Sequence, residues 1–242
     1  MSKNVHMQSS SSSFPTVVAP QLITVGTPSL VQGVYGSRGN LELLACDPHD
    51  GLWVFWFNSD LPDDGEQSPD VAPGEWSGGL RFARGGAYTA AQILQGTLGP
   101  DHLEVLALAD SGDLESWWWS PEQAFRRRPE RVAAGVAAFE AAHGPDGVVE
   151  VVLHTSEGAS LTVVGIPDVY PHRRWQSSRR ATTSLLGPDA AALRLLASAG
   201  VDASEVEGGT VRVHASRRAG ATHELSWRDD EGRIRHLGLP VH

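Results

Sequence analysis

The chain has 242 residues and a formal net charge of −10, and its hydrophobic content of 40% is enough to bury a sizeable core. The acidic balance argues against a nucleic-acid partner or an anionic membrane surface, because phosphate binding needs a basic footprint. One cysteine excludes an intrachain disulfide framework, and 26 glycines with 15 prolines favour short strands and many turns over long helices.

The N-terminal segment, residues 1–13, is polar and ends in a serine run. It lacks the apolar stretch of a signal peptide, so it predicts a disordered tail ahead of a single domain over residues 14–242. No run reaches the roughly 18 apolar residues of a membrane span, and no membrane insertion is expected. These features predict a cytoplasmic protein, or one released without a classical signal peptide.

Strand-like runs begin after this tail. Residues 14–30 carry three prolines among β-branched residues, which is typical of one or two short strands. Residues 41–45 and 52–57 predict a hairpin around a DPHDG turn. In its second arm, Trp53, Phe55 and Phe57 lie on one face and Val54 and Trp56 on the other, so this strand is expected to be buried between two sheets.

Residues 60–74 form the longest expected loop, and this loop is acidic. Its carboxylates could hold a cation, but they lack the glycine and glutamate frame of an EF-hand. We therefore expect an exposed insertion, with no metal and no other cofactor.

The hairpin recurs further along the chain. Residues 93–120 repeat the order of parts in residues 30–60: Gln-Gly, a glycine three residues later, an apolar-Glu-apolar strand, a glycine turn and a Trp-rich strand. A third, weaker copy begins at His143, and the three copies align Glu42, Glu104 and Glu150. Repetition at this period is typical of solenoids and propellers. Aromatic residues are expected to begin the successive units, near Phe14, Trp76, Phe125 and Trp175.

Two later segments can be interpreted in two ways. Residues 129–142 are rich in helix formers, yet we predict a strand there. Residues 188–200 begin with proline and end at glycine as a short helix would, but their alignment with residues 144–155 favours a strand. The C-terminal stretch has three alternating runs at residues 211–213, 224–227 and 233–237, which predict an antiparallel sheet.

These residues resemble the blade repeat of bacterial fucose-binding β-propeller lectins and related repeat-lectin propellers. The first copy matches at Gly36, Gly39, Asn40, Leu41, Glu42, Leu43, Leu44, Ala45, Gly51, Leu52, Phe55 and Trp56, and residues 226–230 look like that family's strand end. The resemblance implies an all-β propeller of four-stranded antiparallel blades, with five blades expected and four as the alternative, one of them shared by the two chain ends. The family's Arg-Asp after the tryptophan is replaced here by Phe57-Asn58.

The resemblance also implies sugar sites between adjacent blades. Such sites need a flat aromatic ring for the C–H face of a sugar and polar groups for its hydroxyls. The predicted ligand-binding residues are Arg38, Asn40, Glu42, Trp56, Glu104, Trp118, Trp119, Trp227 and Arg228. Core packing between blades is the alternative role of the tryptophans. For the recurring glutamates the alternative is a structural carboxylate that caps backbone N–H groups of the next blade.

We therefore predict a non-catalytic, lectin-like propeller that binds a carbohydrate or glycoconjugate, with fucose-type sugars among the expected ligands. The alternative is a protein-interaction propeller whose sugar sites have degenerated and whose partner is another protein. A propeller glycoside hydrolase is a third hypothesis, because two acids could converge at the channel mouth. The sequence has no metalloprotease, nucleophile-elbow, phosphate-loop or CxxC motif, so no enzyme is predicted. Cys46 is expected to be a small buried strand residue.

Overall fold

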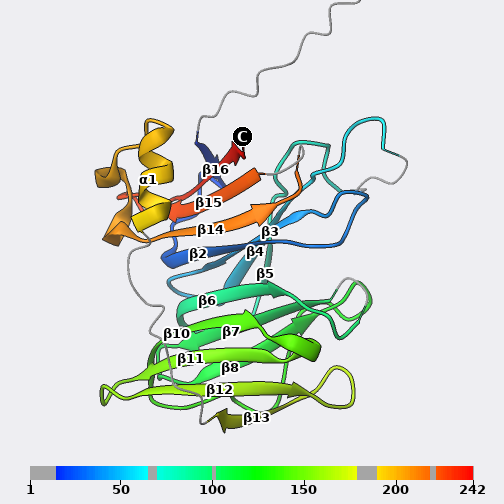
Figure 1. Cartoon of the computed structure of the whole chain (residues 1–242), viewed down its shortest axis with the longest axis vertical. Coiled ribbons are helices and arrows are strands. Elements are labelled where there is room, and N and C mark those ends of the chain that lie inside the picture. Colours follow the sequence, from blue (N-terminus) through cyan, green and yellow to red (C-terminus); the bar gives the residue numbers. More distant parts are fainter. Residues whose placement is uncertain (1–14, 65–69, 100–101, 179–189, 219–221, 242) are drawn as a thin grey trace, which may run out of the picture.

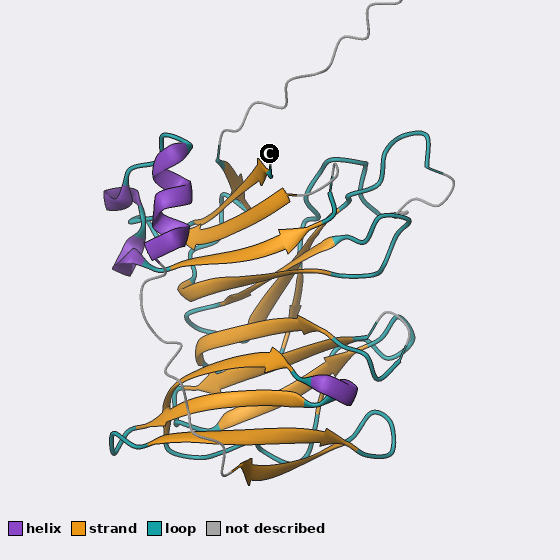
Figure 2. Ribbon diagram, viewed as in Figure 1, coloured by secondary structure: helices purple, strands orange, loops and turns teal. Residues whose placement is uncertain are grey.

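A computed structural model describes residues 15–64, 70–99, 102–178, 190–218 and 222–241. Its strands form four sheets, each of four antiparallel strands (Figure 1). Helical segments are few beside the strands (Figure 2). No helix in these ranges is long and apolar enough to cross a membrane. The predicted tail at residues 1–13 lies outside the described residues.

We call the sheets blades 1 to 4. Blade 1 consists of β2 (Val25–Gln32), β3 (Leu41–Cys46), β4 (Leu52–Phe57) and β5 (Leu80–Phe82). Blade 2 consists of β6 (Tyr88–Gln95), β7 (Leu103–Ala109), β8 (Leu114–Trp119) and β9 (Arg126–Arg127). Blade 3 consists of β10 (Val136–His143), β11 (Val149–Thr155), β12 (Ser160–Pro167) and β13 (Arg173–Ser178). Blade 4 consists of β14 (Val211–Ser216), β15 (Thr222–Arg228), β16 (Ile234–Pro240) and β1 (Thr16–Val18).

The fold is a β-propeller with four blades, the smaller of the two predicted numbers. Blade 4 joins the two ends of the chain, as predicted, because β1 pairs with β16 through Thr16 opposite His236. The predicted hairpin of blade 1 and the strands of the C-terminal stretch are confirmed. The segment 129–142 contains β10, so the predicted strand is present in its second half.

Strands β3 and β7 bury nearly every residue, because blades 1 and 2 each pack against a neighbour on both faces. In β4, Leu52 and Val54 belong to a core shared with blade 2, whereas Phe55 and Phe57 belong to a core shared with blade 4. A third core joins blades 2 and 3. The prediction that β4 is apolar on both faces is therefore confirmed, and Cys46 is buried in β3 as expected.

Polar side chains of the inner strands link each blade to the next. Ser29 accepts a hydrogen bond from a backbone N–H of β6 at 3.1 Å, and Gln92 exchanges two with the backbone of β10 at 2.6 and 2.8 Å. Glu140 of β10 pairs with Arg212 of β14 at 3.2 Å. Ser226 of β15 donates to a carbonyl of β2 at 3.2 Å. These contacts join the four blades into a ring.

Three of the four aromatic residues that were expected to begin the units lie instead on or beside the outermost strand of the preceding blade, and Phe14 lies outside the described residues. Trp76 forms an isolated bridge with Phe57 ahead of β5, and Trp175 lies within β13. Phe125 directly precedes β9. The predicted units are therefore offset from the blades by one strand, because each blade finishes with the strand that follows its Trp-rich hairpin.

The strand favoured for residues 188–200 is wrong, because the structure has helix α1 (Ala190–Ser198) there. Leu196 and Ala192 of α1 are buried against blade 4, on a core that includes Leu225 and Trp227. The helix lies beside β14 and β15 (Figure 1). Gly200, at φ +80°, follows its end, where the N–H of Val201 bonds the carbonyl of Leu196. Short 3₁₀ turns occur at Pro145–Gly147, Ala203–Glu205 and Glu207–Gly209.

Candidate ligand-binding site

A glutamate occupies the same position in the second strand of every blade. Strand registers place Glu42 opposite Trp56, Glu104 opposite Trp118, and Glu224 opposite Gly238. Glu150 has the corresponding place in β11, opposite Val164. Sequence reasoning aligned three of these glutamates and missed Glu224, because the turns around it differ. Glu104 and Glu224 have similar surroundings, and those of Glu42 differ sharply from both.

The carboxylate of Glu104 is paired with basic side chains of the protein, which fill the space beside it. Its carboxylate pairs with Arg128 at 2.8 Å and with Arg173 of blade 3 at 2.8 Å, and it bonds His102 at 3.0 Å. Burial alone would raise the pKa of Glu104, but the hydrogen bond from His102 and the two guanidinium charges outweigh it and lower the pKa to about 2. Trp118 is buried and stacks on His102 at 5.9 Å.

Glu224 is closed in a similar way at the boundary between blades 4 and 1. It accepts hydrogen bonds from Arg218 at 3.0 Å, from His236 at 2.9 Å and from Ser216 at 2.7 Å. Burial again opposes ionisation, but His236 and Arg218 lower the pKa of Glu224 to about 2. His236 in turn contacts the ring of Trp76 at 5.2 Å. Both glutamates thus form structural ion pairs with side chains. The sequence-based alternative, a carboxylate that caps backbone N–H groups of the next blade, differs from this in the partners.

Glu42 has no such partner. Its side chain is 8% exposed, and within the described ranges no donor or cation pairs with its carboxyl group. Burial without a compensating charge raises the pKa of Glu42 to about 8, so the group is largely protonated at neutral pH. A buried carboxyl group without a partner is costly, and such groups gather at functional sites.

The Glu42 carboxyl group lines a pocket of about 260 Å³ between blades 1 and 2. Trp56, the cross-strand partner of Glu42, and Val54 form the wall from blade 1. Leu103 and its cross-strand partner Trp119 form the wall from blade 2. The other lining residues are Tyr35, Asp70, Leu80, Pro121 and Phe125.

Three of the aromatic rings that line this pocket contact one another. Tyr35 contacts Trp119 edge to face, with ring centroids 6.5 Å apart and an interplanar angle of 84°. Trp119 also contacts Phe125 at 6.4 Å. The pocket therefore offers flat apolar surfaces from both blades around a single buried polar group, which is the composition of a small-ligand site.

One strand position contributes to the difference between this open pocket and the closed cluster at Glu104. Arg128 lies opposite Ser116 of β8, and its guanidinium fills the space beside Glu104. The corresponding position of blade 1, opposite Val54, carries Leu80. Leu80 is 42% exposed and brings no charge to Glu42.

The structure brings three of the predicted ligand-binding residues together, namely Glu42, Trp56 and Trp119. Two others lie in the β2–β3 connection. Arg38 is bound to Asp64 of the acidic loop at 2.6 and 3.0 Å, and Asn40 is buried. The N–H of Asn40 donates to the carbonyl of Tyr35 at 2.8 Å, and Tyr35 lines the pocket although Arg38 and Asn40 do not.

The remaining predicted residues lie elsewhere. Glu104 and Trp118 belong to the closed cluster between blades 2 and 3. Trp227 is 1% exposed in the core beneath α1, and Arg228 bonds the carbonyl of Thr24 at 2.8 Å and pairs with Glu207 at 2.9 Å. Sequence reasoning missed Tyr35 and Phe125, which come from connections between strands, where no period marks them.

Comparisons with known proteins find similarity among solved structures. No family model matches the chain, and no curated protein matches it. Among solved structures it is similar to a mutant of the Aleuria aurantia lectin in complex with α-methyl-L-fucoside, with a TM-score of 0.40 and 9% identity. The match covers 87% of this chain and 56% of that chain, so this chain spans about half the length of that lectin.

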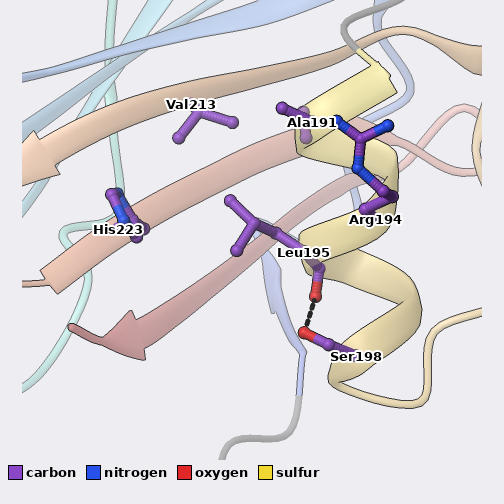
Figure 3. Close-up of a pocket in the computed structure, with 7 residues that line it drawn as sticks. Ala191, Arg194, Leu195, Ser198, Val213 and His223 are labelled. Atoms are coloured by element: carbon purple, nitrogen blue, oxygen red, sulfur yellow. Dashed lines mark hydrogen bonds between the residues drawn. The ribbon is translucent and has the colours of Figure 1, made fainter. Parts of the chain in front are cut away.

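A second hollow lies between α1 and blade 4 (Figure 3). Leu195 and Ser198 of α1 line it, together with Val213 of β14 and His223 of β15. The Ser198 hydroxyl donates to the carbonyl of Leu195 at 2.7 Å, so it is already bonded within the helix. None of the described residues that line this hollow is a buried polar group without a partner, unlike Glu42 in the first pocket.

Proposed function

We propose that the protein is a carbohydrate-binding, lectin-like propeller and that the pocket between blades 1 and 2 holds the sugar. The observation that carries the proposal is the Glu42 carboxyl group, buried and unpaired between Trp56 and Trp119. A protonated carboxyl group donates one hydrogen bond and accepts others, as sugar hydroxyls require. The tryptophan rings provide the apolar surface for a sugar's C–H face.

The size of the pocket limits the ligand. A volume of about 260 Å³ is at the lower end for ligand pockets, which are roughly 300–1,000 Å³. It suits one sugar ring, with any further residues of a glycan outside. The resemblance of the repeat to fucose-binding propellers makes fucosides one class to test.

The proposal is tested by Trp56→Ala. Loss of this ring should raise the dissociation constant for the bound sugar about tenfold, because aromatic packing contributes on the order of 1 kcal/mol. A glycan array on the wild-type protein identifies the sugar, and calorimetry or tryptophan fluorescence then gives the constants.

The matched control is Trp53→Ala on the same strand. Trp53 points to the opposite face, where its indole N–H bonds Asp47 at 3.1 Å. This variant should bind sugar as the wild type does. A wild-type protein that binds no glycan on the array contradicts the proposal.

A second candidate function, a protein-interaction propeller with degenerated sugar sites, is favoured by the closed clusters at Glu104 and Glu224. At both positions the protein's own arginine and histidine occupy the surroundings of the carboxylate. One stoichiometric protein partner in a pull-down, together with a blank glycan array, would decide for it.

A further inference from the structure

The pocket at Glu42 has a distinctive balance of charge. Two of its lining residues, Glu42 and Asp70, are acids, and none of the described residues that line it is a lysine, arginine or histidine. Four aromatic side chains line it as well, namely Tyr35, Trp56, Trp119 and Phe125. Aromatic faces and carboxylates both attract cations.

We infer that this pocket selects a sugar that carries a free ammonium group, an amino sugar, over neutral and acidic sugars. The inference deepens the proposed function and rests on it. The ammonium group would lie against the aromatic rings and pair with the Glu42 carboxylate, in the role that Arg128 has beside Glu104.

The comparison between the two interfaces supports this assignment. A carboxylate at the Glu104 position is stabilised by guanidinium groups from Arg128 and Arg173. At Glu42 the corresponding strand position carries Leu80, so none of the described lining residues supplies a cation. A ligand cation would complete the same kind of pair, and an anionic sugar would instead meet two acids and no base.

Cation binding at Glu42 should be linked to proton release. Because burial raises the pKa of Glu42 to about 8, the empty pocket holds the carboxyl group protonated at neutral pH. A cation favours the ionised form, so affinity should rise with pH and level off above pH 8. The other titratable groups on the described lining are Asp70 and Tyr35, and the wall from blade 2 is apolar.

The test compares probes of matched shape. Glucosamine, glucose and glucuronate share one ring, and tetramethylammonium supplies a cation whose charge does not change with pH. Glucosamine should bind roughly tenfold more tightly than glucose at pH 7, and glucuronate should bind least. Between pH 5 and pH 7 the affinity for tetramethylammonium should rise by up to about tenfold per pH unit.

Two variants locate the effect. Glu42→Gln keeps the shape of the side chain and should abolish both the preference for glucosamine and the pH dependence. Leu80→Arg should place a guanidinium beside Glu42 and reduce tetramethylammonium binding roughly tenfold or more. Leu161→Arg is the matched control, because Leu161 is a similarly exposed strand leucine, at 48%, in blade 3. It adds the same charge and should leave binding unchanged, and unfolding curves check that all variants are folded.

The outcomes separate the two proposals. If glucose binds as tightly as glucosamine, or if tetramethylammonium affinity is independent of pH, the preference for amino sugars is overturned while sugar binding stands. If no sugar binds at all, the proposed function fails and the amino-sugar assignment fails with it.

Discussion

At the scale of single residues, the charge cluster at Glu104 carries a large free-energy cost of burial. Three charged groups are almost completely removed from water there, with Arg173 fully buried and Glu104 only slightly exposed. Burying ions costs free energy that their mutual attraction must offset. Such a cluster is tolerated only while every member has its partner.

Glu104→Gln should therefore destabilise the protein strongly. Two buried guanidinium groups would lose their counter-charge, and breaking a buried pair in this way costs about 3–5 kcal/mol. Urea denaturation at pH 7 measures the change in the free energy of unfolding.

The surface pair between Arg131 and Asp113 is the control, because the Arg131 side chain is 61% exposed. Arg131→Ala should change stability by about 0–1 kcal/mol. Equal effects of the two substitutions would show that the Glu104 cluster does not contribute as its burial implies.

The recurring glutamates were visible in the sequence, but their different roles were not. The apolar-Glu-apolar pattern is the same at Glu42 and Glu104, so a pattern of residues predicts one role for both. The difference comes from Arg128 and Leu80, at one strand position, and from Arg173 in the next blade. Partners at such sequence separations leave no local signal, and only the blade packing reveals them.

At the scale of elements, α1 is a helix in a segment for which the sequence alignment predicted a strand. Glycine after its end was the correct signal, and the similarity to residues 144–155 was misleading. Its amphipathic character explains the outcome, since Leu196 and Ala192 are spaced by four and face blade 4. The strands were easier to predict because their alternation and glycine turns are local.

The contribution of α1 can be measured with Leu196→Ala. Leu196 is 1% exposed, and truncating a buried leucine costs about 2–5 kcal/mol. Thermal or urea unfolding would show the loss. Arg194→Ala, on the exposed face of the same helix, should have little effect. If the two variants unfold alike, α1 is not packed on blade 4.

At the scale of the whole molecule, the buried carboxylate clusters give stability a pH dependence, and the cluster at Glu104 also joins blade 2 to blade 3. Glu104 and Glu224 have pKa values lowered to about 2 from an ordinary 4.5. Groups of this kind stabilise the fold above pH 4.5, and their contribution is lost as the pH falls toward 2.

Urea unfolding between pH 5 and pH 2.5 should therefore show a steady fall in the free energy of unfolding. Each unit of a pKa shift corresponds to about 1.4 kcal/mol. Glu42 acts in the opposite direction and at higher pH, because its raised pKa removes stability between pH 4.5 and pH 8. A profile that is flat below pH 4.5 would contradict the ion pairing described at both clusters.

The pairing of β1 with β16 also has a consequence for biosynthesis. Thr16 and His236 are opposite one another although 220 residues separate them. During translation β1 leaves the ribosome long before its partner exists, so the fourth blade cannot be completed until almost the entire chain has emerged. The outer strand pair of blade 4 therefore forms only after β16 has been made.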